Sequence, residues 1–394
     1  MTYDFDKIIE RRGTNCSKWD TDPSTIEGVH YPVSNPLPLW IADMDFAVAP
    51  EITQALVERA RHGVFGYPIV PDSCYEAIIE WEEKRHGWKI ERDWILFSPG
   101  AVPAAHMAVQ AYCQPGDKTI LQQPVYYPFF RTIYNNGGLV VNNALSLEGE
   151  RYEMDFDLLE RQAADPRASF FILCSPHNPV GRVWSASDLE RVGDICARHG
   201  LLVFADELHC DIIMPGHKHV PFASLNDACR DNSITVIAPS KTFNLAGLQA
   251  TVVIIPNPRL RQRFENVLSQ NSISKPNLFA ITGLEAAYRH GEKWLDELLV
   301  YIKGNYDFLV QTLKERLPQV KVLPLEGTFL AWADFSALEP DPEKLQRRML
   351  TEAEVWLDEG YIFGSEGAGF ERIVLACPRA ILKEAIDRIV RTFG

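Results

Sequence analysis

Several common features are missing from this sequence of 394 residues, and their absence excludes whole classes of protein. No apolar run approaches the roughly 20 residues of a membrane-spanning helix, and the first residues do not have the form of a signal peptide. There is no repeat period and no low-complexity tract. Basic residues (39) are fewer than acidic ones (53), and the formal net charge of −14 argues against binding to nucleic acid or to an anionic membrane.

Metal-binding, disulfide and nucleotide-binding motifs are also scarce. The eight cysteines are scattered and form no Cys-x-x-Cys pair, so we predict reduced, mostly buried thiols in a cytoplasmic protein. His217 and His219 are the only closely spaced histidines, and without a third ligand nearby a surface loop is a better interpretation than a metal site. The sequence contains neither a Gly-x-Gly-x-x-Gly fingerprint nor a P-loop, which leaves nucleotide binding unsupported.

The stretch that is most informative about function surrounds Lys241. Residues 234–238 are mostly β-branched and lead into Pro239, as in a buried strand that stops abruptly. A lysine just past a strand stands where open α/β sheets bind ligands. Partial desolvation would lower its pKa and free the amine as a nucleophile, which a Schiff base with pyridoxal 5′-phosphate (PLP) requires. A solvated surface lysine is the alternative; a Ser-x-x-Lys serine nucleophile is excluded because residue 238 is alanine.

The rest of the first 255 residues alternates strands with helices, which predicts an α/β fold. The strands are uniformly apolar, as in a mainly parallel sheet that is covered on both faces. Strands are expected at 94–97, 119–121, 139–141, 170–173, 201–205, 234–238 and 251–255. Helices are expected at 51–62, from a cap near Asp72 or Ser73 to 86, up to about 112, and from a capping box at Ser185 and Asp188 to Gly200.

Three polar side chains follow these strands directly: Asn178, Asp206 and Lys241. Because the carboxyl ends of parallel strands meet at one edge of a sheet, we expect the three to converge on one crevice. A further turn, Ser98–Pro103, joins a strand to a helix N-terminus, and its free N–H groups form a candidate anion site. An ordinary turn is the alternative for that segment.

The two ends of the chain have a different pattern. Helices dominate from 256 to about 316, and strands are expected at 320–323, 328–332 and 372–376, before a closing helix at 381–392. The glycine-rich run 364–369 precedes a strand, so we predict a flexible loop there. We therefore predict an N-terminal segment (1–50) that joins the small domain, a large domain (51–290) and a small C-terminal α+β domain (291–394). Asp43 and Asp45 could form a paired-carboxylate site, but a solvated turn with buried aromatics fits the local pattern better.

Together these strings resemble, nearly end to end, a fold-type I PLP enzyme of the aspartate aminotransferase superfamily. Within it the chain is most similar to the MalY/PatB-type cystathionine β-lyases, also called C–S lyases. The resemblance implies a large domain with a mainly parallel seven-stranded sheet, plus a smaller α+β domain. The strings that carry it are 11–14, 18–20, 40–46, 65–67, 175–181, 206–209 and 240–249.

The resemblance also implies a role for each cofactor-binding residue. Lys241 would form the Schiff base, and Asp206 would pair with the pyridine nitrogen and keep the ring protonated. Tyr126 would stack on the ring, and Asn178 would contact the ring oxygen. The phosphate would be held by the N–H groups of Gly100, Ala101 and Val102 and by the Ser240 hydroxyl.

The substrate side of the site is implied in the same way. Arg372 matches the arginine that grips the substrate α-carboxylate, and the Ala42 N–H would meet the same group. Tyr67 matches a tyrosine that reaches the phosphate from the other subunit, which implies a homodimer with shared active sites. Arg379 matches no carboxylate-binding position and is interpreted as structural.

Two positions depart from the aminotransferase pattern. Gln249 stands where those enzymes usually carry a phosphate-binding arginine, and His209 stands where many carry a tyrosine near the ring oxygen. Both fit the lyase branch. The expected activity is a C–S β-lyase that converts L-cystathionine and related S-conjugates of L-cysteine to pyruvate, ammonia and a thiol such as homocysteine, which would place it in methionine biosynthesis and cysteine metabolism. A class I/II aminotransferase and a regulatory role through protein contacts are the alternatives.

Overall fold

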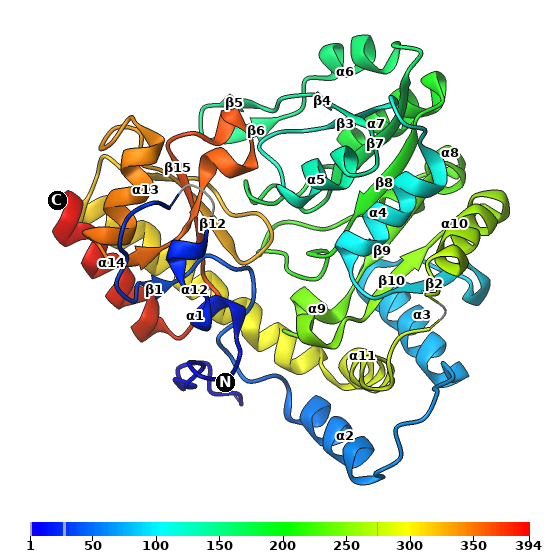
Figure 1. The fold of residues 1–394 in the computed structure, drawn as a ribbon, viewed down its shortest axis with the longest axis horizontal. Helices are drawn as coiled ribbons and strands as arrows, with labels where there is room; N and C mark the ends of the chain where they lie inside the picture. Colours follow the sequence, from blue (N-terminus) through cyan, green and yellow to red (C-terminus); the bar gives the residue numbers. More distant parts are fainter. Residues whose placement is uncertain (1, 27–28, 274) are drawn as a thin grey trace.

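The computed structural model describes residues 2–26, 29–273 and 275–394. Figure 1 shows a larger sheet on the right and a smaller sheet on the left, beside the C-terminus. In the N-terminal segment, β1 (Leu37–Pro38) pairs in parallel with β13 (Val355–Trp356), and the two form a separate two-stranded sheet. The division of the chain at residues 50 and 290 stays a prediction.

The larger sheet has seven strands in the order β2-β10-β9-β8-β7-β3-β4. Its neighbours pair in parallel except for β10, which runs antiparallel to both β2 and β9. The predicted fold, a mainly parallel seven-stranded sheet, is confirmed. The strands are β2 (Ile95–Ser98), β3 (Lys118–Leu121), β4 (Leu139–Asn142), β7 (Ala168–Cys174), β8 (Leu202–Asp206), β9 (Ser233–Ile237) and β10 (Thr251–Ile254).

Helices cover both faces of this sheet because alternate strand residues are buried on opposite sides. In β8, Leu202 and Phe204 belong to one apolar cluster, whereas Val203 and Ala205 belong to another. The first face carries α4 (Ala101–Tyr112), α5 (Pro128–Tyr134) and α10 (Pro258–Gln270); the second carries α3 (Asp72–His86), α6 (Phe156–Ala163), α7 (Ala186–His199) and α11 (Leu278–His290). Helices α2 (Pro50–Arg61), α8 (Asp227–Asp231) and α9 (Pro239–Thr242) complete this part of the chain.

The predicted signals at the start and end of α7 are both present. Ser185 and Asp188 form the expected capping box, and Gly200 ends the helix at a φ of 74°, a conformation that glycine adopts without strain. The expected cap at the start of α3 is wrong: its N-cap is Pro71, and the described structure has no side-chain hydrogen bond there.

The smaller sheet is antiparallel, in the order β11-β12-β15-β14. Its strands are β11 (Lys321–Val322), β12 (Leu330–Asp334), β14 (Asp358–Glu359) and β15 (Phe370–Val374), and its helices are α12 (Glu292–Arg316), α13 (Pro342–Thr351) and α14 (Arg379–Phe393). One short 3-10 turn, 365–367, lies within the predicted glycine-rich loop, and another, 360–363, precedes it. The hairpin β5 (Ser146–Glu148) and β6 (Arg151–Glu153), and the short α1 (Ser17–Asp20), are the remaining helices and strands.

One expectation from composition is met within the described residues. All eight cysteines are free thiols, and seven of them are buried. None of the described helices combines the length and apolarity that a bilayer-crossing segment requires.

Candidate active site

A cavity of about 280 Å³ opens at the carboxyl edge of the larger sheet and extends to β15 of the smaller one. Asn178, Asp206 and Lys241 lie at or just past the carboxyl ends of β7, β8 and β9, and all three line the cavity, as predicted. The cavity is also lined by Ala42, Gly100, Ala101, Val102, Tyr126, His209, Ser240 and Arg372, so eleven predicted site residues share one space.

Lys241 lies in α9, immediately after β9, and its side chain enters the cavity. Its Nζ donates a hydrogen bond to the Ala42 carbonyl oxygen at 2.6 Å. Burial lowers the pKa of Lys241 to about 8, and the Arg372 charge acts in the same direction. A substantial fraction of this amine is therefore neutral near physiological pH, as a nucleophile or a general base must be.

Asp206 is the last residue of β8 and is 6% exposed. Burial raises its pKa to about 7, although the Leu208 N–H donates to its Oδ1 at 3.2 Å and the Lys241 charge opposes the shift. If a cationic group of a ligand took the place of water beside this carboxyl, the carboxyl would become fully ionised. The site therefore offers an acidic partner for a positively charged ring.

The start of α4 forms part of the cavity wall, with Gly100, Ala101 and Val102. The first N–H groups of a helix lack partners within the helix, and the helix dipole adds positive potential there. Ser240 and Gln249 line the same cavity. These groups are suited to bind an anion such as a phosphate. Position 249 supplies a glutamine to them and no arginine.

His209 presents a polar atom without a partner. The residue is 5% exposed, and its Nδ1 has no hydrogen-bond partner among the described residues. Burial and the nearby cations lower its pKa well below the usual value, so the ring is neutral at pH 7. A buried polar atom without a partner in a cavity is what a ligand with its own hydrogen-bonding groups would satisfy.

Arg372 has a charged partner that the sequence analysis missed. It forms an ion pair with Asp358, and it donates to the Asn178 Oδ1 at 3.0 Å and to the Trp40 carbonyl oxygen at 2.7 Å. Asp358 is 3% exposed and lies opposite Arg372 across the β14–β15 pair. No short motif points to it, because only the register of two short strands brings the two together. Tyr127, which also lines the cavity, was missed too.

Tyr67 is the one predicted site residue that lies outside the cavity. Its side chain is fully exposed, in an extended segment where Val64, Phe65 and Ile69 are also mostly exposed. Arg379, predicted to be structural, donates to the Asn305 Oδ1 at 2.5 Å and lies away from the cavity lining.

Two other predictions are wrong. Asp43 and Asp45 do not form a solvated turn: Asp45 is 3% exposed and pairs with Lys18 at 2.7 Å, and Arg11 bridges both carboxylates. Buried carboxylates need such partners. His219 is not on a surface loop, because it is buried against Glu207 at 2.9 Å; only His217 is exposed.

Comparison with known proteins agrees with this geometry. Residues 35–389 match the family described as aminotransferase class I and II. The chain belongs to this family. It is 44% identical, over 385 residues and 98% of both chains, to cystathionine beta-lyase PatB of Bacillus subtilis (strain 168).

Two solved structures of family members superpose over the whole chain. One is cystalysin from Treponema denticola, which contains a pyridoxal 5′-phosphate cofactor (TM-score 0.95, 36% identity, covering 100% of this chain and 99% of that one). The other is the PLP-bound C–S lyase from Staphylococcus hominis (TM-score 0.91, 30% identity, covering 100% and 98%). Both confirm the fold-type I architecture.

Proposed function

We propose that this family member is a PLP-dependent C–S β-lyase that cleaves L-cystathionine, and related S-conjugates of L-cysteine, to pyruvate, ammonia and a thiol. The observation that carries the proposal is that Lys241, with its lowered pKa, and Asp206 line the same cavity. The lyase names of PatB and of the Staphylococcus hominis enzyme support the choice of reaction.

The residues of the cavity fit PLP. Lys241 would bind the aldehyde covalently, and the Asp206 carboxylate would pair with the pyridine nitrogen. Tyr126 would lie against the ring, with Asn178 and the unpartnered His209 near the ring oxygen. Gly100, Ala101, Val102 and Ser240 would hold the phosphate at the start of α4. When bound, PLP supplies a cationic ring that accepts the electron pair left at Cα.

The side chains of the protein position the substrate and move its protons. Arg372 and the Ala42 N–H would bind the α-carboxylate, with Asp358 and Asn178 holding the guanidinium in place. The substrate amine would take the place of Lys241 on the aldehyde, and the freed neutral amine of Lys241 would then remove the α-proton. A thiolate leaves readily from Cβ because the pKa of a thiol such as cysteine is only about 8.5. The aminoacrylate that is released takes up water to give pyruvate and ammonia.

A substrate series tests the leaving-group requirement. L-Cystathionine, L-cystine and S-alkyl-cysteines should each yield pyruvate in a lactate dehydrogenase-coupled assay. L-Alanine has the same amine and carboxylate but no C–S bond at Cβ, and should yield none. Pyruvate from alanine at a comparable rate would contradict elimination as the reaction.

The lowered pKa of Lys241 predicts a pH dependence for cofactor capture. The rate at which cofactor-free protein takes up PLP should rise with pH and level off above about 8. Below that pKa the amine is protonated and cannot attack, whereas above it the amine is free. Stopped-flow absorbance gives the rate. A rate that keeps rising toward the ordinary lysine pKa of about 10.4 would contradict a perturbed Lys241.

We also propose a cytoplasmic homodimer with shared active sites. Eight unpaired thiols fit a reducing compartment. The exposed apolar segment Val64–Ile69, which includes Tyr67, is suited to contact with a second copy of the chain. Tyr67 would reach the phosphate of the other subunit.

Subunit complementation tests the shared site. Tyr67→Ala and Lys241→Ala proteins should each lose activity, yet mixed and reassembled together they should exceed the sum of the two. A hybrid dimer has one site with both Lys241 and Tyr67 intact. Turnover after mixing, with light scattering to verify dimers, measures this. A mixture no more active than its parts would place Tyr67 in its own subunit's site or outside any site.

A further inference from the structure

A second group of titratable side chains is buried behind Lys241, on the face of the sheet covered by α3. It consists of Glu82, His86, Glu207, Asp211 and His219, which we call the acid–histidine cluster. Glu82 and His86 come from α3, whereas the other three follow β8. None of them lines the cavity described above. The proposed reaction assigns them no direct contact with substrate or cofactor.

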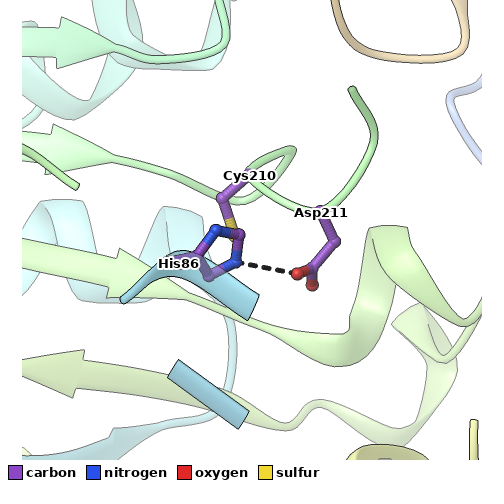
Figure 2. A group of neighbouring side chains, drawn as sticks. All are labelled: His86, Cys210 and Asp211. Atoms are coloured by element: carbon purple, nitrogen blue, oxygen red, sulfur yellow. Dashed lines mark hydrogen bonds and ion pairs between the residues drawn. The ribbon is translucent and has the colours of Figure 1, made fainter. Parts of the chain in front are cut away.

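Asp211 is the centre of this cluster. Figure 2 shows the His86 ring directed at the Asp211 carboxylate, and Nε2 lies 2.9 Å from Oδ1. The Trp81 Nε1 donates to the same oxygen at 3.1 Å, and the Thr242 hydroxyl donates to Oδ2 at 2.7 Å. Asp211 thus connects α3 to α9, the short helix that carries Lys241.

A second hydrogen-bonded pair of the cluster anchors the residue that follows Asp206. Glu207 contacts His219 at 2.9 Å and accepts from the Phe222 N–H at 2.8 Å. The His86 and His219 rings meet edge to face at 5.4 Å, so the two pairs adjoin. Asp206 and Lys241 are therefore each followed in the chain by a residue whose side chain is anchored in the cluster, Glu207 and Thr242.

The His86–Asp211 pair is charged at neutral pH. Hydrogen bonding to Asp211, with the charges of Glu82, Asp211 and Glu207, outweighs burial and raises the pKa of His86 to about 9. The His86 partner lowers the pKa of Asp211 despite its burial, whereas burial raises the pKa of Glu82 to about 8. His86 and Asp211 are thus a buried imidazolium–carboxylate pair.

A metal centre explains the cluster less well. Ligand atoms of His86, Cys210 and Asp211 lie within 4.8 Å of one another. However, the Asp211 oxygens already accept three hydrogen bonds, and a protonated imidazole cannot coordinate a cation. Burial also raises the pKa of the Cys210 thiol well above its usual value, whereas a metal binds the thiolate.

We propose that Asp211 and His86 are positioning residues for Lys241, acting through the Thr242 hydroxyl. Thr242 is fully buried and is the last residue of the four-residue α9. Such a short helix has little hydrogen bonding of its own, so the bond to Asp211 fixes its rotation and thereby the direction of Lys241. A displacement of about 1 Å in a reacting group can cost on the order of 10²-fold in rate. This inference rests on the proposed function, because it concerns the same lysine.

The test compares Thr242→Val, which removes the hydroxyl at nearly constant shape, with Thr242→Ser, which keeps it. Three quantities are measured: the rate of PLP capture by cofactor-free protein, the pH midpoint of the absorbance of the bound cofactor, and kcat and KM for L-cystathionine. For Thr242→Val we expect slower capture, a shifted midpoint and a kcat about 10- to 100-fold lower at unchanged KM. Thr242→Ser should restore all three. Thr119→Val, a buried threonine of β3 outside the cavity, is the matched control.

Two other outcomes would contradict the proposal. A Thr242→Val protein with a lower thermal midpoint, but with unchanged capture, absorbance and kcat, would show a purely structural role. If Thr242→Val does not fold, His86→Gln makes the same comparison from the far side of the ion pair. A stoichiometric divalent ion on the purified enzyme that chelation removes, together with loss of stability, would replace the ion pair with a metal site. Pyruvate production by the unmodified enzyme tests the proposed function separately.

Discussion

Lys241→Ala should abolish covalent cofactor binding and reduce turnover of L-cystathionine by on the order of 10⁴-fold or more. The substitution removes both the amine that binds the cofactor aldehyde and the base that takes the α-proton. The amine lies in the cavity at 2.6 Å from the Ala42 carbonyl, with its pKa lowered to about 8. No other lysine lines that cavity in the described structure. Borohydride reduction followed by absorbance and peptide mapping measures the covalent adduct.

The control for this experiment is Lys89→Ala, since the Lys89 side chain is 83% exposed. This variant should keep both the adduct and turnover. A visible chromophore that borohydride still fixes to the Lys241→Ala protein would mean that another lysine binds the cofactor.

Asp206→Asn should retain the fold and the cofactor but lose roughly 10²–10³-fold in kcat, or about 3–4 kcal/mol of barrier. The amide nearly matches the carboxylate in shape, but it cannot hold a proton on the pyridine nitrogen. Asp206 is buried, with burial raising its pKa to about 7, so the carboxylate is costly to maintain unless a cation is its partner. Single-turnover kinetics isolates the chemical step.

The comparison for Asp206→Asn is Asp231→Asn, because the Asp231 side chain, at the last residue of α8, is 57% exposed. Equal rates for Asp206→Asn and the unmodified enzyme would remove Asp206 from the account of how charge at Cα is stabilised. A protein that no longer binds PLP at all would instead assign Asp206 to cofactor affinity rather than to catalysis.

The central part of the site could be predicted from the sequence because each of its residues is tied to a local signal. Asn178, Asp206 and Lys241 follow apolar strands, and parallel strands bring their carboxyl ends to one edge. Gly100 had a local signal as well, because a strand ends just before it and a helix begins just after it. The uniformly apolar strands indicated a parallel sheet without knowledge of long-range pairs.

The rest depended on contacts between distant segments. Asp358 meets Arg372 only through the pairing of the two-residue β14 with β15. Arg11 and Lys18 neutralise Asp43 and Asp45 from more than 20 residues away. The local sequence shows only that the two aspartates are polar, and so it favours a solvated turn. His86 meets Asp211 across 125 residues. Buried ion pairs of this kind have no periodicity that a single sequence displays.

The most direct test of the account is the fate of L-cystathionine when no 2-oxo acid is present. Purified enzyme with bound PLP is incubated with the substrate, and pyruvate, thiol and ammonia are followed with and without 2-oxoglutarate. A C–S lyase should give equal amounts of pyruvate and homocysteine in both reactions and no glutamate in either. Products that appear only when 2-oxoglutarate is supplied, with glutamate formed in step, would contradict the lyase proposal and identify an aminotransferase.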